Sequence, residues 1–267
     1  MLFFMNSQEN GTQPMQIHRR VMLSLIIASL MLVASCAGGA KTKKARYDCS
    51  KRTAQAVEKY QKGKYGSVKT MLEDVKLQCA GSDVADTAEY YLAMSLMRMK
   101  MYIEAKLEFT RFVQDYPQSV FFEEAQVRVG YCELKQSRSA DRDQTETHEA
   151  LKLLKDFLEN YPSSAFADSA QKYLKETVEK LAEKEFNTAR FYQKIREREA
   201  AVVCYKSFIT EYPASKYTQP ARLNMAQALI ELGRKAEAKE VLDELLAQEK
   251  NGDLAAQARA LLAKCKE

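Results

Sequence analysis

The residues with the clearest chemical potential stand near the amino terminus, where an aliphatic residue and two small residues precede a cysteine in Val33-Ala34-Ser35-Cys36. Small residues let the backbone enter the groove of a signal peptidase, and only a thiol can carry a diacylglyceryl thioether. A basic pair, Arg19-Arg20, and the mostly apolar residues 21–33 come first, a stretch too short to span a bilayer core of about 30 Å. The pattern predicts a secretion signal over 1–35, cleavage before Cys36 and lipidation of Cys36. An ordinary signal peptide with a chance cysteine is the alternative.

Two segments flank this signal. Residues 1–14 take no part in it, so Met1 and Met15 both stay open as the start of translation. Residues 36–46 are small and basic without apolar periodicity, which predicts a flexible tether that holds the folded part away from the lipid. The chain is therefore expected to be anchored to a membrane rather than to span it.

The composition is typical of a helical, globular chain that is poor in catalytic groups. Hydrophobic residues make up 46% and charged residues 29%, with 9 glycines, 5 prolines and no tryptophan. The net charge of +5 is mild and spread along the chain, so no nucleic-acid partner is expected. His148 is the only histidine outside the signal, and no glycine-rich phosphate loop, GxSxG or HExxH motif occurs. We therefore expect no enzymatic activity, no metal site and no cofactor.

One phrase occurs three times along the chain. It begins at Phe112, Phe157 and Phe208, and each copy continues to a Tyr-Pro pair and then to a serine two residues beyond the proline. Because proline cannot continue a helix, each Tyr-Pro is expected to end one helix, and the serine to cap the next. An alanine stands seven residues before each phenylalanine, and the same spacing without Tyr-Pro recurs at Val68 with Val75 and at Ala238 with Leu245.

Each repeat is expected to be a hairpin of two helices. A hairpin cannot bury its apolar stripe alone, so we predict an all-α solenoid of about five stacked hairpins with a C-terminal capping helix. The third hairpin carries a polar insertion that is expected to be an exposed loop, and the fourth begins with an unusually long, charged helix. The expected hairpins cover 47–80, 84–116, 119–160, 164–212 and 215–249, with the closing helix at 252–266. We group them as N-terminal repeats at 47–160 and C-terminal repeats at 161–267.

The alternating small and aromatic residues resemble tetratricopeptide repeats, and the Phe-x-x-x-Tyr-Pro-x-Ser variant behind a lipobox resembles the BamD family of assembly lipoproteins. The resemblance covers nearly all of the chain after Cys36, although the first and fifth hairpins lack the Tyr-Pro. It implies a non-enzymatic component of the BAM complex at the outer membrane, facing the periplasm. It also implies that the N-terminal repeats recognise unfolded outer-membrane proteins, while residues 161–267 hold a BamA-like barrel protein and other assembly lipoproteins.

A peptide-binding groove is expected on the first helices of hairpins one to three. In tetratricopeptide repeats the groove positions lie six and three residues before, and one, four and five residues after, a small residue, here Ala56, Ala93 and Gly130. Such an aromatic and methionine-rich surface suits an extended peptide that ends in an aromatic residue or carboxylate. The candidate residues are Thr53, Tyr60, Thr87, Tyr90, Met94, Met97, Arg98, Tyr131 and Lys135. Packing of these side chains between hairpins is the alternative.

The export signal places the cysteines in a compartment that permits disulfides. With the first turn expected near Gly63, residues equally distant from that turn face each other, which brings Cys49 opposite Cys79. A disulfide there would staple the terminal hairpin. The other cysteines are expected to stay free, two as small buried hydrophobes and the last unpaired: Cys132, Cys204 and Cys265.

Two other functions stay open at this point. A different periplasmic repeat lipoprotein, one that scaffolds cell-wall synthesis or division, would share both the fold and the anchor. A glycan-capturing surface lipoprotein would need a tryptophan-lined platform, and this chain has no tryptophan. The basic residues after Cys36 also favour the periplasmic side over surface export.

Overall fold

The computed structural model describes residues 47–266, so the predicted signal, the tether and the lipidation site Cys36 lie outside the described residues. Contacts divide the chain into two units at Tyr47, and the larger unit holds all the helices reported below. Regular structure within the described residues is entirely helical. The helices are α2 (Cys49–Gln61), α3 (Tyr65–Gln78), α4 (Ala85–Arg98), α5 (Tyr102–Asp115), α6 (Phe122–Gln136), α7 (Thr145–Asn160), α8 (Ala167–Lys194), α9 (Arg198–Glu211), α10 (Thr218–Glu231), α11 (Lys235–Gln248) and α12 (Asp253–Lys266).

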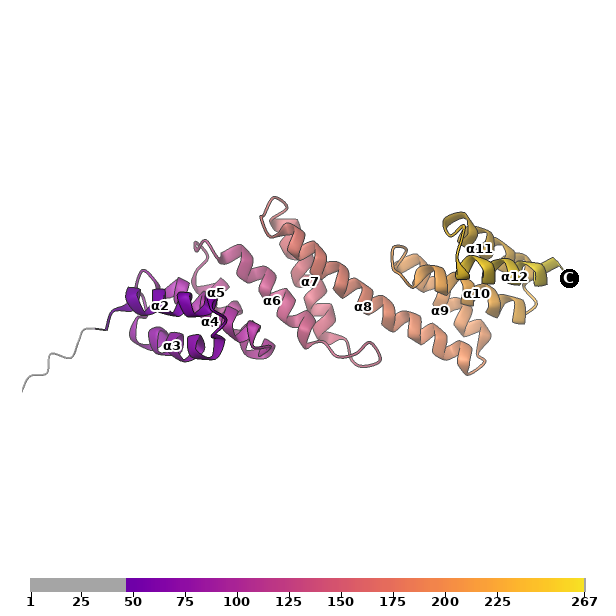
Figure 1. Cartoon of the computed structure of the whole chain (residues 1–267). Helices are drawn as coiled ribbons and strands as arrows, with labels where there is room; N and C mark the ends of the chain where they lie inside the picture. Colours follow the sequence, from indigo (N-terminus) through magenta and orange to yellow (C-terminus); the bar gives the residue numbers. More distant parts are fainter. Residues whose placement is uncertain (1–46, 267) are drawn as a thin grey trace, which may run out of the picture. The chain divides into compact units, whose positions relative to one another are not determined.

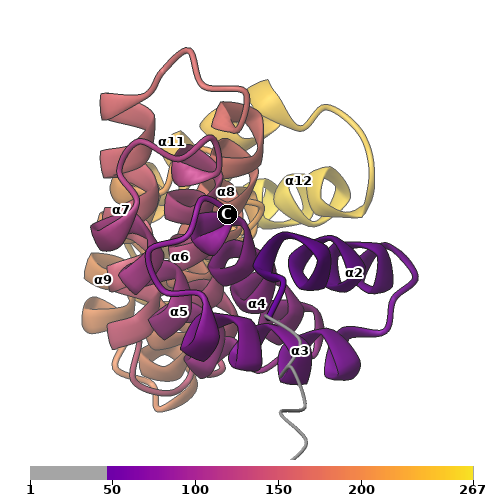
Figure 2. The ribbon, with the colours of Figure 1, turned by 90° about the vertical axis from the view of Figure 1, so that its left-hand side faces the viewer.

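These helices form consecutive antiparallel hairpins (Figure 1). In each hairpin an even-numbered helix packs on the odd-numbered helix that follows it, and α12 closes the row on α10 and α11. First helices of neighbouring hairpins also touch, as α2 touches α4 and α6 touches α8. Figure 2, seen from the N-terminal hairpins, shows α2 and α3 in front with α4 beside them. The predicted tetratricopeptide-type solenoid of five hairpins with a capping helix is confirmed.

Each Tyr-Pro ends a helix, as predicted from the sequence. Tyr116, Tyr161 and Tyr212 are the C-terminal caps of α5, α7 and α9, and each donates its backbone N–H to the carbonyl of the phenylalanine four residues earlier. The prediction that the serine caps the next helix is wrong. Its Oγ accepts the backbone N–H of the residue two positions on, as Ser119 does from Phe121 at 3.3 Å, so it fixes the turn that leads into the helix.

The residues seven apart that define the repeat form the core of the hairpins. All of them are at most 3% exposed: Val68 and Val75, Ala105 and Phe112, Ala150 and Phe157, Ala201 and Phe208, and Ala238 and Leu245. The small members let helices approach and the large members fill the remaining space. The approach is very close at Gly130 of α6, where an added Cβ would lie 2.9 Å from Leu154 of α7.

Helix α8 is the longest described helix and serves two hairpins. It has 28 residues, which corresponds to a length of about 42 Å. It contacts α6 and α7 as well as α9 and α10. The charged run that stood out in the sequence therefore belongs to a helix that joins the N-terminal repeats to the C-terminal repeats.

The insertion of the third hairpin is held in place by side chains. Gln144 is 2% exposed and donates its Nε2 hydrogens to backbone carbonyls inside the loop, including that of Ser139 at 2.8 Å. Lys180 of α8 donates to the Ser137 carbonyl at 2.8 Å. The loop is therefore ordered by buried hydrogen bonds while its tip, at Arg142, stays exposed.

Cys49 and Cys79 are joined by a disulfide whose Cα atoms lie 5.9 Å apart. The bond closes the open end of the first hairpin, from the first residue of α2 to the residue that follows α3. Cys132 is free and buried, whereas Cys204 and Cys265 are free and partly exposed, so Cys204 is less buried than expected. Among the described helices, none is long and apolar enough to cross a bilayer.

Candidate functional site

The positions of the first helices that reach the surface differ in part from the predicted ones. A helix turns by about 100° per residue, so positions three before and four after the small residue lie about 40–60° from it. Positions two before, one after and five after lie about 100–160° from it. Because the small residue faces the hairpin partner, the first set is buried, except for the partly buried Tyr60 four residues after Ala56, and the second set reaches the surface.

The prediction that all nine candidates line an open groove is therefore wrong for three of them. Thr53, Tyr90 and Met97 are 3%, 4% and 7% exposed, respectively. Tyr90 stacks on Phe121 with ring centroids 4.2 Å apart, and its ring also contacts Phe112. These side chains pack between hairpins, so they can shape the groove only by supporting the residues that line it.

The other six candidates reach the surface. Thr87, Met94, Tyr60 and Tyr131 are partly buried, and Arg98 and Lys135 are exposed. The structure adds aromatic and basic residues that the position rule missed: Tyr65, Tyr91, Arg128 and Tyr173. Tyr91 and Arg128 stand two before Ala93 and Gly130. A search for aromatic or basic residues at that spacing could have found both.

Tyrosines from three helices meet at the N-terminal end of this groove. The Tyr60 ring of α2 lies 5.2 Å from Tyr65 at the start of α3 and 5.2 Å from Tyr91 of α4, both edge-on. Tyr91 in turn contacts Phe121, at 6.1 Å. Burial raises the pKa of Tyr60, so its hydroxyl stays protonated at neutral pH and can donate a hydrogen bond.

Arg98 stands beside this tyrosine cluster with its guanidinium largely in solvent. Its Nε donates to the Tyr65 hydroxyl at 3.1 Å, and its Cζ lies 5.5 Å from the centre of that ring. The hydrogen bond to Tyr65 raises the pKa of Arg98, which keeps the charge in place. One face of a permanent cation is therefore held by an aromatic ring while the rest is open to an anion.

Arg128 provides a second cation, and it is fixed by two partners. Its Nη2 lies 2.6 Å from the Glu124 carboxylate, and its Nη1 donates to the Tyr173 hydroxyl of α8 at 3.1 Å. Burial acts to lower the pKa of Arg128, but the hydrogen bond and charge of Glu124 outweigh it and the net shift is upward. Tyr60 feels the positive charge of both Arg98 and Arg128. The tyrosine cluster is thus flanked by two arginines.

The groove continues past Arg128 along α6 and α8. The rings of Tyr131 and Tyr173 lie 4.6 Å apart. The Lys135 ammonium lies 5.2 Å from the Tyr131 ring centre and 3.3 Å from Glu176. We use the name tyrosine–arginine groove for the surface formed by Tyr60, Tyr65, Tyr91, Arg98, Arg128, Tyr131 and Tyr173, which runs over four successive first helices and the start of α3.

This arrangement has the chemistry of a binding surface. Aromatic faces with protonated hydroxyls accept apolar and aromatic side chains, and arginines pair with carboxylates. No acid, base and nucleophile are brought together in the groove. Within residues 47–266, no cluster of histidine, cysteine and carboxylate side chains has the geometry to hold a metal ion.

Comparison with known proteins assigns the chain to a family. An outer membrane protein assembly factor BamD from Caulobacter vibrioides is 25% identical over 222 residues, which cover 81% of this chain and 73% of that protein. The factor of the same name from Rickettsia prowazekii is 22% identical over 221 residues, which cover 81% of this chain and 88% of that protein. The solved TPR2AB-domain:pHSP90 complex of yeast Sti1 aligns at 15% identity and a TM-score of 0.42, over 82% of this chain and 98% of that one. Because residues 48–245 match the family described as YfiO, outer membrane lipoprotein, the chain belongs to that family.

Proposed function

We propose that this chain is a non-enzymatic lipoprotein subunit of the machinery that assembles β-barrel proteins in the outer membrane, anchored through Cys36 and facing the periplasm. The observation that carries the proposal is the tyrosine–arginine groove, because it offers binding chemistry without catalytic chemistry. The names of the relatives, outer membrane protein assembly factors, support the same process.

The groove is proposed to hold an extended segment of an unfolded barrel protein that ends in an aromatic residue and a carboxylate. The ring of such a residue fits the tyrosines around Tyr60, where edge-on contacts are already formed. The carboxylate would pair with Arg98, whose charge has no carboxylate partner among the described residues. Arg128 is already paired with Glu124, so it orients the neighbouring rings more than it supplies a free charge.

The C-terminal repeats are proposed to hold the barrel-forming subunit and other assembly lipoproteins. Their first helices form an open, shallow hollow of about 530 Å³ that is lined by Arg190, Phe191 and Lys194 of α8 and by Asn224 of α10. Phe191 is 57% exposed, which is high for an aromatic residue. An apolar anchor ringed by basic and amide groups is typical of a protein-docking site.

The groove is tested with the full chain and a ten-residue peptide that ends in phenylalanine with a free carboxylate. We expect Arg98→Ala to weaken binding about fivefold and to abolish the preference for the free carboxylate over its amide. Tyr91→Ala should weaken both peptides about tenfold. Arg111→Ala, an exposed change on α5, is the matched control and should have no effect. Equal weakening by Arg98→Ala and Arg111→Ala would count against the groove.

A second experiment separates the assembly role from another cell-envelope scaffold. The lipidated chain is purified from outer membranes under mild detergent, and its partners are identified. We expect a multidomain barrel protein, and Phe191→Ala should reduce its recovery while leaving peptide binding unchanged. Recovery of cell-wall or division proteins without a barrel partner would favour a different scaffold lipoprotein.

A further inference from the structure

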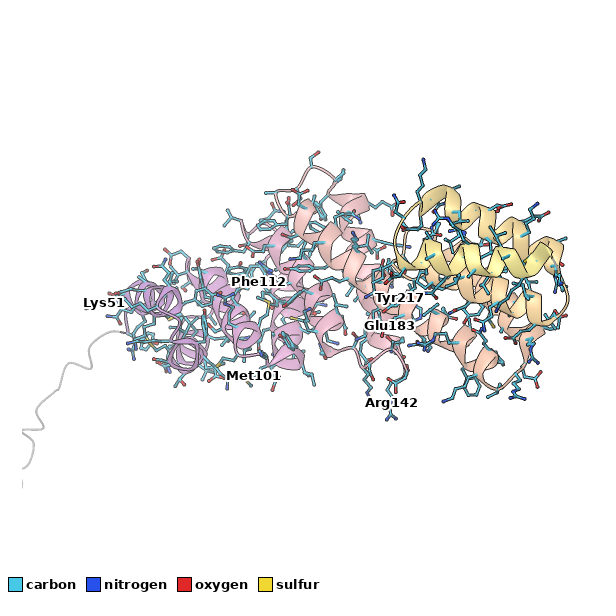
Figure 3. The ribbon with its side chains drawn as sticks, turned by 45° about the vertical axis from the view of Figure 1, so that its right-hand side comes forward. Lys51, Met101, Phe112, Arg142, Glu183 and Tyr217 are labelled. Carbon is cyan, nitrogen blue, oxygen red and sulfur yellow. A yellow bond between two sulfur atoms is a disulfide. The ribbon has the colours of Figure 1, made fainter. Side chains whose placement is uncertain are left out.

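Helix α5 presents an apolar face to solvent. Ile103 and Leu107 stand about one helical turn apart on this face, and their side chains are 67% and 49% exposed. Leu77, near the end of α3, is 81% exposed and lines a hollow together with Leu107. Figure 3 shows Met101, the residue before α5, at the lower margin and Phe112 further up among the helices. Helix α5 is therefore apolar on its buried face and on this exposed face.

An open hollow lies on each side of α5. One, of about 490 Å³, lies between α3 and α5 and has Leu92 and Leu96 of α4 in its lining. The other, of about 310 Å³, lies between α5 and α7 and has Val129 of α6 and Leu153 of α7 in its lining. Helix α5 is thus a ridge between two hollows, a shape against which another helical surface can pack.

The other second helices show that the fold does not require this apolar face. Ile103 and Leu107 stand two residues before and two residues after Ala105, the small residue of the repeat. The equivalent residues of α3, α7, α9 and α11 are all exposed, and a single one of them, Val203, is a large aliphatic residue. These residues are Gly66 and Thr70, His148 and Lys152, Glu199 and Val203, and Ala236 and Glu240.

The charges on this face are arranged so that the face is complementary to itself. Glu104 and Arg111 both line the hollow beside α3, and each stands three and a half residues from the midpoint between Leu107 and Glu108. A two-fold axis through that midpoint would place Glu104 opposite Arg111 of an antiparallel copy of α5, and it would do so twice. Glu104 has no cationic partner among residues 47–266, and Arg111 is loosely paired with Glu108 at 3.5 Å.

Lys100 and Asp115 show the same relation at the two ends of α5. Each stands seven and a half residues from the same midpoint, so the same axis brings Lys100 opposite Asp115 of the copy. Within one chain neither charge is favourable, because a helix N-terminus disfavours cations and a helix C-terminus disfavours anions. Lys100 also has φ of 62°, a conformation that glycine adopts with less strain. The stability of α5 therefore does not account for these two residues.

We infer that a second copy of this chain covers this face, with α5 packed antiparallel against α5 of the copy. The two Leu107 side chains meet at the two-fold axis, and Ile103 extends the apolar contact. Glu108 also stands close to the axis, but Lys76 pairs with it at 2.5 Å and neutralises its charge. The inference goes beyond the proposed assembly function and does not need the groove, which lies mainly on the first helices.

The test is the oligomeric state of the full mature chain with Cys36→Ser, which needs no detergent. Sedimentation equilibrium at up to about 100 μM should show a monomer–dimer equilibrium. Arg111→Glu should weaken association about thirtyfold, because symmetry places the altered pair twice in the dimer. The matched control is Glu149→Arg on α7, an exposed charge reversal at the position equivalent to Glu104, and it should change association less than about twofold.

A mixture of two single variants tests the antiparallel arrangement itself. Glu104→Arg should weaken self-association about as much as Arg111→Glu does. An equimolar mixture of the two should associate about as strongly as the parent chain, because each variant then faces the opposite charge of the other. A mixture that stays monomeric, or a parent chain that stays monomeric up to about 100 μM, would overturn the inference. A different protein as the occupant of this face would give that second result.

The position of the axis is read in the lipidated chain by oxidative cross-linking. Leu107→Cys should form a disulfide with the same residue of the second copy, because both lie at the axis. Val203→Cys, at the equivalent exposed position of α9, is the control and should cross-link no more than the parent chain, whose free Cys204 and Cys265 set the background. Equal cross-linking of the two variants would refute the assigned interface.

Discussion

Reduction of the disulfide between Cys49 and Cys79 should release the first hairpin while the rest of the stack stays folded. Only two residues of α2 are buried, Thr53 and Ala56, so packing alone holds this helix weakly. Its neighbours are α3 and α4, and it has no other helix contact of similar extent. In a solenoid each repeat is stabilised by its nearest neighbours, so a loss at one end stays local.

The magnitude follows from the length of the closed loop. The two cysteines are 30 residues apart. Closing a loop of that length removes chain entropy from the unfolded hairpin that corresponds to about 3.6 kcal/mol at room temperature. A change of that size shifts an opening equilibrium by up to about 400-fold.

Native-state hydrogen exchange measures this opening residue by residue. Amides of α2 and α3 in the full chain should exchange up to about 400-fold faster after reduction, whereas amides of α10 and α11 should not change. Reduction leaves every side chain in place, so it isolates the cross-link from the packing of Cys79. The Cys204→Ser variant controls for effects of the reductant on free thiols, because Cys204 is free and partly exposed.

Two results would contradict a local release of the first hairpin. If the exchange of α2 is unchanged by reduction, packing of Ala56 and its neighbours suffices and the cross-link adds little. If all helices exchange faster together, the stack unfolds as one cooperative unit and the nearest-neighbour description does not hold. Because Tyr60 stands on α2, the expected release should also weaken peptide binding in the groove.

Two further predictions concern packing and thiol chemistry. Gly130→Ala should lower the free energy of unfolding by about 1 kcal/mol in thermal melts, because its Cβ would meet Leu154 at 2.9 Å; Gly66→Ala, with open space around the added Cβ, should raise it by about 0.5 kcal/mol, and equal shifts would contradict the close approach. Burial raises the pKa of the Cys132 thiol to about 12, so this thiol should stay protonated and resist alkylation at pH 8. Cys204 should react faster than Cys132, and the opposite order would contradict the assigned burial.

The residues that line the groove could be predicted from the sequence only in part, because neighbouring positions on a helix point in different directions. The sequence identified the right helices and the right kinds of residue, since Tyr60, Arg98 and Tyr131 do reach the surface. It did not decide between adjacent positions such as Tyr90 and Tyr91, which point about 100° apart on α4. Tyr90 is buried against Phe121, and Tyr91 lines the groove. Both are tyrosines, so residue type carries no signal that separates them.

The fold could be predicted from the types of residue and their spacing along the chain. Proline cannot stay inside a helix, so the three Tyr-Pro pairs mark helix ends wherever the chain is placed. Small and large residues seven apart, such as Ala105 and Phe112, share one helix face and must be buried together. Cys49 and Cys79 face each other for a similar reason, because one turn joins two helices of similar length. These features depend on near neighbours in the chain, which a sequence displays directly.

Which residues form the binding surfaces was decided only by the tertiary structure. Which side of α4 stays open is decided by the helices packed on it, α2, α3 and α5, and by Phe121, which lies 23 residues beyond the end of α4 in the sequence and stacks on Tyr90. Ile103 and Leu107 stand four residues apart and share one face of α5, but both are exposed, because α5 buries its other face with Ala105, Phe109 and Phe112. Binding surfaces therefore emerge from packing between repeats, whereas the repeats themselves can be read along the chain.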